Sequence, residues 1–183
     1  MGILGIYASQ ISGHLVTNSY ESISTVTVGA GGSSSISFTS IPSTYKHLQI
    51  RMLANYSGSV GGGYVHFNSD SSSGNYSYHA FGGDGAGSVS TASGANANRG
   101  LYTSVAGTVT TQPNVMIMDI LNYTDSNIYK TLRTLYGWDA NGSGYAEFGS
   151  SNWRSTAAIT SVTLTPNNSF AQYTHAALYG IRG

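Results

Sequence analysis

The stretch KHLQIRMLA, residues 46–54, decides the fold class of this chain. Its apolar residues Leu48, Ile50 and Met52 alternate with polar or charged residues. A period of two is typical of a β-strand that buries one face, because successive side chains of a strand point to opposite sides of the sheet. The stretch therefore predicts a strand whose apolar face packs on a core.

The same alternation occurs elsewhere in the chain. SISFTSI (35–41) and GYVHF (63–67) show it, and two further strand-like stretches flank the Asn141-Gly142 dipeptide, a strong hairpin signal. No window has helical apolar spacing. We therefore expect an all-β protein: an antiparallel β-sandwich, jelly-roll-like, with eight to ten strands.

Two segments lead to different expectations. Residues 115–118, Val-Met-Ile-Met, are continuously apolar, which predicts a central strand covered on both faces. Residues 81–100 have no hydrophobic period and many glycines and serines, which predicts a long surface loop. With no linker in sight, we expect one sandwich domain over residues 19–183 and an extended N-terminal arm over residues 1–18.

The composition restricts the possible partners. Charged residues make up 8% of the chain, and seven Lys and Arg balance seven Asp and Glu. Such a surface has no field to attract phosphate, so we expect neither nucleic acid nor membrane as a partner. A low content of charged residues and fourteen tyrosines are typical of a protein that packs against other copies of itself. We therefore expect a homo-oligomer.

The sequence offers little for catalysis. There is no cysteine, and the five histidines are scattered without a nucleophile or zinc pattern. The acidic residues show no spacing typical of a glycosidase pair. We therefore expect no enzymatic activity and no cofactor.

The loop HFNSDSSSGNY, residues 66–76, has oxygen-bearing side chains at alternate positions. Calcium binds clustered oxygen atoms, so Asn68, Asp70 and Asn75 are weak metal-ligand candidates. The alternative is a polar loop in which Asn and Asp bond to their own backbone. With one carboxylate, the loop alternative is favoured and no metal is expected.

The segment 137–153 holds both tryptophans next to polar residues. Aromatic rings can stack on a sugar while polar groups bind its hydroxyls. The possible glycan contacts are Trp138, Asp139, Asn141, Tyr145 and Trp153. The alternative is that the two tryptophans anchor the core or a subunit interface.

The first residues of the chain read GILGIYASQISGHL, residues 2–15. No Lys or Arg precedes Lys46, so the stretch does not resemble a secretory signal. It is either an arm that docks on a neighbouring subunit or an edge strand of its own domain. The candidate assembly residues are Ile3, Leu4, Ile6, Tyr7, Ile11 and Leu15.

Several stretches together resemble structural proteins of tailed phages, especially phages of cyanobacteria and other marine bacteria. The most specific stretches are SIPSTYKHLQIR (40–51) and ALYGI (177–181). The others are GILGIYASQISGHL, residues 25–39 before the first of these, FNSDSSSGNYSYH (67–79), WRSTAAITSVTLTP (153–166) and the ending that begins FAQYTHA.

This resemblance implies a virion structural protein, most simply a capsid decoration or cement protein that stabilises the head through subunit contacts. The alternative is a tail-fibre or knob adhesin domain that binds a host surface glycan. Other virion proteins, the major capsid protein or tail components, are the implied partners, with a trimer favoured. The implied location is the virion, assembled in the host cytoplasm.

Overall fold

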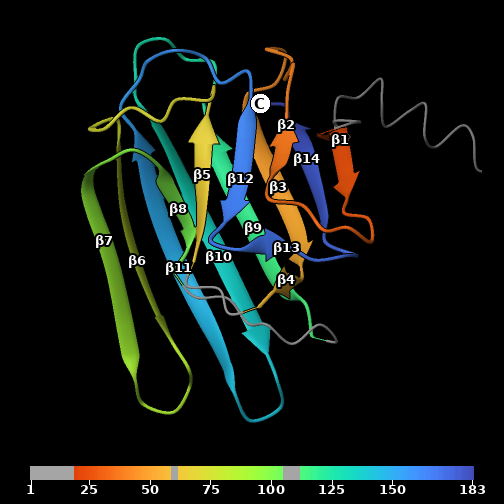
Figure 1. Ribbon diagram of the computed structural model, residues 1–183. Helices are drawn as coiled ribbons and strands as arrows, with labels where there is room; N and C mark the ends of the chain where they lie inside the picture. The colour runs from red at the N-terminus through yellow and green to blue at the C-terminus, as the bar shows by residue number, and fades with distance from the viewer. Residues whose placement is uncertain (1–18, 59–61, 105–111) are drawn as a thin grey trace, which may run out of the picture.

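The computed structural model describes residues 19–58, 62–104 and 112–183, and Figure 1 shows these residues as strands joined by loops. An eight-stranded sheet has the spatial order β1 (Tyr20–Thr27), β14 (His175–Ile181), β3 (His47–Ala54), β9 (Asn114–Leu121), β10 (Lys130–Asp139), β11 (Gly144–Trp153), β6 (Tyr76–Gly83) and β7 (Val89–Ala97). A four-stranded sheet has the order β2 (Ile36–Phe38), β12 (Val162–Pro166), β5 (Gly63–Phe67) and β8 (Gly100–Thr103). A short ribbon pairs β13 (Ser169–Phe170) with β4 (Tyr56–Ser57).

The two larger sheets form an antiparallel β-sandwich, which confirms the predicted fold class. Every strand pair among the described residues is antiparallel. The four-stranded sheet covers the upper part of one face of the eight-stranded sheet (Figure 1). The hairpins β6–β7 and β10–β11 extend below it, so their ends lie outside the sandwich proper (Figure 1). None of the described residues belongs to a helix long and apolar enough to cross a membrane.

The core lies between the two sheets, on what we call the inner face of the large sheet. Leu48, Ile50 and Met52 of β3 are buried there, as their alternation predicts. Side chains of the small sheet, such as Val65 and Leu164, complete the core. Burial of this apolar surface is the main force that holds the sheets together.

A buried lysine begins strand β10. Lys130 has no exposed surface, and its ammonium group donates to the backbone carbonyls of Asp125, Ile128 and Thr156. Burial lowers the pKa of Lys130, although the nearby Asp125 carboxylate acts in the opposite direction. Through these three hydrogen bonds, the ammonium group holds the loop before β10 next to the segment after β11.

Strand β9 corrects the expectation for residues 115–118. The strand is central, as predicted, but only one of its faces is buried. Met116 and Met118 point into the core, whereas Val115 and Ile117 are 48% and 36% exposed on the outer face. The expectation failed because a continuous apolar run looks the same whether its second face is covered or open.

The expectation of a long loop over residues 81–100 is wrong. Strands β6 and β7 form a hairpin here and pair from Tyr76 with Ala97 to Gly83 with Val89. Most of β7 is exposed, so its sequence needs no apolar alternation. The backbone pairing instead depends on small residues, since a Cβ at Gly94 would lie 2.5 Å from the ring of Tyr78.

The N-terminal arm, residues 1–18, lies outside the described residues, and with it the six candidate assembly residues. The described chain enters the sheet at Ser19, whose carbonyl accepts a hydrogen bond from the Arg182 amide at 3.1 Å. Strand β1 follows at the sheet edge, paired with β14.

Candidate functional site

The end of the β10–β11 hairpin brings together four of the five predicted glycan contacts. Trp138 and Tyr145 are directly opposite in register. Asn141 and Gly142 form the turn with φ values of 53° and 112°, the positive values that a tight hairpin turn requires. Asp139 fixes this turn, because its Oδ1 accepts the Asn141 amide at 2.8 Å.

A hollow of about 440 Å³ lies between this hairpin end and the end of the β6–β7 hairpin. Its lining includes Trp138 and Tyr145 together with Asp139 and Asp84. The Tyr145 hydroxyl is hydrogen-bonded to the Ser90 hydroxyl, which ties the two hairpins together. Two carboxylates next to two aromatic rings could accept hydrogen bonds from a polyol and stack on its apolar side.

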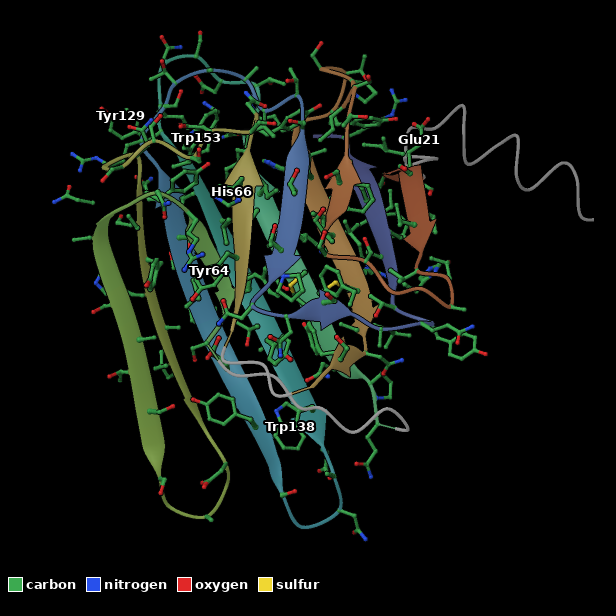
Figure 2. The ribbon with its side chains drawn as sticks, viewed as in Figure 1. Glu21, Tyr64, His66, Tyr129, Trp138 and Trp153 are labelled. Atoms are coloured by element: carbon green, nitrogen blue, oxygen red, sulfur yellow. The ribbon has the colours of Figure 1, made fainter. Side chains whose placement is uncertain are left out.

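Trp153 is not part of this hollow, so the expectation that it contacts a glycan is wrong. Figure 2 shows Trp138 and Trp153 near opposite ends of the β10–β11 hairpin. Trp153 is 3% exposed, and its ring packs on Phe67 with 5.7 Å between centroids. A ring buried between two sheets cannot stack on a sugar.

The predicted metal candidates are brought together in the β5–β6 loop, where they bond to the protein. Asp70 Oδ2 accepts Trp153 Nε1 at 2.7 Å and Asn75 Nδ2 at 2.8 Å. Asn68 Oδ1 accepts the backbone amides of Thr160 and Ser161 at 2.8 and 3.1 Å. In the part of the chain that the structure describes, no three His, Asp or Glu side chains cluster.

Asp70 is the ionised group of this loop. Its partial burial favours the neutral form, but hydrogen bonds from Trp153, Ser72 and Asn75 outweigh that effect and hold the pKa below its usual range. The carboxylate thus joins the loop to the core tryptophan. This bonding fits the loop alternative of the sequence prediction.

Glu147 lies on the inner face and is 2% exposed. Burial raises its pKa, partly offset by hydrogen bonds from Ser104. The Ser104 amide lies 2.8 Å from its Oε1 and 3.1 Å from its Oε2. Both carboxylate oxygens therefore bind the end of β8, which is a structural arrangement.

The outer face of the large sheet carries a feature that the sequence analysis missed. Side chains of β3, β6, β7, β9, β10 and β11 form an exposed apolar surface, and its larger members are between 36% and 77% exposed. We call it the outer apolar patch: Leu53, Phe81, Val89, Val115, Ile117, Leu135, Ala146 and Phe148.

A polar, internally bonded network borders the patch on the same face, and beyond it Leu121 of β9 is 46% exposed. Gln49 donates to Asp119 at 2.8 Å and accepts from Arg51 at 2.7 Å, while Arg133 lies 3.6 Å from Asp119. The Arg51 guanidinium also lies 5.4 Å from the ring centroid of Tyr179. The outer apolar patch is thus bounded on this side by a satisfied polar network.

The sequence contains part of the signal for the patch. Val115 and Ile117 of the apolar run share one face with Leu135 and Phe148 once the strands are paired. The pairing partners of a strand cannot be read from a single sequence, so the surface formed by several strands was not visible there.

Comparisons with known proteins add little to this description. No protein-family model and no curated protein sequence matches the chain. Among solved structures, the galectin LEC-6 of Caenorhabditis elegans is 7% identical with a TM-score of 0.29, covering 92% of this chain and 99% of its own. A fructofuranosidase of Schwanniomyces occidentalis is 3% identical with a TM-score of 0.21, covering 90% of this chain and 33% of its own. At such scores neither likeness bears on function.

Proposed function

We propose that this chain is a structural subunit of a virion, of the capsid decoration or cement type, that works by packing against other protein subunits. The outer apolar patch carries the proposal. Contiguous apolar patches of a few hundred Å² are often functional, and larger ones commonly mark protein interfaces. The sequence resemblance to tailed-phage structural proteins supplies the kind of assembly.

The neutral charge supports the same proposal. A chain with 8% charged residues has little electrostatic repulsion to keep copies apart. Interfaces between permanent partners are depleted in charge at their centre and enriched in aromatic residues. The patch fits that description, because Phe81 and Phe148 pack in it with 5.8 Å between ring centroids.

Sedimentation of the full chain tests the proposal. We expect an oligomer, with a trimer favoured, at micromolar concentration. A folded monomer at tens of micromolar would contradict the assembly part of the proposal. Copy number per particle tests the virion part: a decoration protein is present in hundreds of copies, a tail protein in a handful.

A second candidate function, glycan binding by a fibre or knob domain, is favoured by the hollow at the hairpin ends. Asp84, Asp139, Trp138 and Tyr145 converge there from two separate hairpins. A glycan array would test it with the wild-type chain and an Asp84→Asn/Asp139→Asn variant. We expect binding that the variant loses and that Asp125→Asn, a carboxylate outside this hollow, keeps; an array with no bound glycan would exclude this candidate.

A further inference from the structure

The outer apolar patch is arranged as two parallel rows that cross the strands. In the first row, Ile117, Leu135, Phe148 and Phe81 are successive register partners on β9, β10, β11 and β6. In the second row, the partners are Leu53, Val115, Gly137, Ala146, Gly83 and Val89. The second row therefore has little or no side chain at its centre.

This gap produces a trough in the sheet surface. A hollow of about 740 Å³ lies over Gly137 and Ala146, and Val115, Ile117 and Leu135 line its sides. Pro113 adds a further apolar residue to the lining. The trough continues the apolar character of the patch.

The size of the patch selects the kind of occupant. Two rows on one face of a sheet cover a width of about 14 Å, and six strands cover about 24 Å. The resulting area, roughly 350 Å², is less than half of the ~800 Å² per partner that a stable face-to-face interface buries. An extended segment of seven or eight residues would span the length at ~3.3 Å per residue.

The chemistry of the patch also limits the occupant. The polar network of Gln49, Asp119 and Arg133 borders the patch and is already bonded internally. Those groups therefore do not need a charged partner. An uncharged segment with several aliphatic side chains is the complement to this surface.

Residues 2–15 of the chain have this composition. They contain no Asp, Glu, Lys or Arg, and they contain Ile3, Leu4, Ile6 and Tyr7 within five positions. The described chain begins at Ser19, beside the sheet edge, and the preceding 18 residues can span up to ~60 Å when extended. The segment is long enough to reach another subunit.

We propose that residues 2–15 of a neighbouring copy bind in the outer apolar patch, across Gly137 and Ala146. Because the proposed function is packing against other subunits, the segment is assigned to the patch of a neighbour and not to that of its own chain. This inference rests on the proposed assembly function and names the contact that it uses.

Disulfide cross-linking tests the contact, because the native chain has no cysteine. Two full-length chains of different tag size would be mixed, one with Ile6→Cys and the other with Ala146→Cys. We expect a covalent heterodimer under mild oxidation. The matched control replaces Ala146→Cys by Thr131→Cys, an exposed outer position of β10 beyond the polar network and outside the patch, and should give at least tenfold less product.

The outcomes separate this inference from the proposed function. An oligomer that forms without the Ile6–Ala146 cross-link, or with equal yield at Thr131, overturns the inference and leaves the assembly function intact. A chain carrying both cysteines that cross-links only within itself also overturns it. If the wild-type chain forms no oligomer, that result counts against the proposed function. A second cross-link, between chains with Ile6→Cys and chains with Leu135→Cys, gives a further check. Adding Ala146→Trp to the Leu135→Cys chain fills the trough and should lower the yield of this cross-linked product at least fivefold.

Discussion

The inner and outer faces of the eight-stranded sheet are made by alternate residues of the same strands, and they differ in what completes them. The inner face is closed by the four-stranded sheet and buries Leu132 of β10 to 1% exposure. The outer face leaves Leu135 of the same strand 60% exposed. The alternation that folds the sheet therefore does not account for the apolar residues on its outer face.

This difference distinguishes the apolar residues that form the core from those that lie on the surface. Inner apolar residues are required because water must be excluded from the core. Outer apolar residues do not help to exclude water from the core, and polar residues already occupy the outer positions a few residues away, as at Asp119 and Arg133. The outer apolar patch is therefore the surface to which we assign the proposed subunit contact.

A matched pair of truncations on β10 tests the difference between the two faces most directly. Leu132→Ala should lower the free energy of unfolding by about 2–5 kcal/mol, because it leaves a cavity in the core. Leu135→Ala should change the stability of the subunit by less than about 0.5 kcal/mol. Urea unfolding of both variants at low protein concentration measures the difference; equal costs would show that the outer face is also part of the fold.

The second prediction concerns the ionised group that supports the inner face. Asp70→Asn should cost about 1–3 kcal/mol, because it weakens charge-assisted bonds to Trp153 and Asn75. Since the pKa of Asp70 is lowered in the folded chain, its stabilisation is present above about pH 4 and is lost as the pH falls through the folded value. Thermal unfolding between pH 2 and 7 measures it.

The acid sensitivity has a clear control. The amide that Asp70→Asn introduces cannot ionise, so the variant should lose less stability than the wild type between about pH 4 and pH 2. Parallel curves for the two proteins would contradict a stabilising carboxylate at this position.

A charge placed in the outer apolar patch should affect association more than folding. Leu135→Arg should weaken self-association at least tenfold, about 1.4 kcal/mol, because a buried charge without a partner opposes the contact. Thr131→Arg, on the same face of the same strand but outside the patch, is the control. Sedimentation equilibrium compares the two, and equal effects would place the interface elsewhere.

The smallest effect is expected in the polar network that borders the outer apolar patch. Asp119→Asn keeps an acceptor for Gln49 but removes the attraction to Arg133, whose side chain is 57% exposed. Such exposed pairs contribute about 0–1 kcal/mol, and salt screens them. Chemical denaturation at low and high salt measures it; a cost above about 1 kcal/mol would mean that the polar network also supports the sheet.

The sequence predicted the fold class because each strand carries its own evidence. Leu48, Ile50 and Met52 alternate as the structure has them, and Asn141-Gly142 forms the hairpin turn that its composition indicates. These are local properties, set within a few residues of backbone.

The features that the sequence did not predict depend on pairing between strands. Strand β7 is visible only through its backbone pairing with β6, because its side chains are small and exposed. Trp153 has polar sequence neighbours, yet Phe67 and Asp70 bury it from another part of the chain. The hollow at the hairpin ends likewise needs Asp84, which lies about fifty residues before Trp138.

The ammonium group turned inward at the start of β10 gives the fold a built-in chemical reporter. The chain has two lysines, and Lys46 is exposed whereas Lys130 is enclosed. An amine-reactive reagent will modify Lys46 at once, but it reaches Lys130 only when the loop before β10 separates from the segment after β11. The rate of that second modification, followed by mass spectrometry, therefore records how often this corner of the sandwich opens, without any label being engineered into the chain.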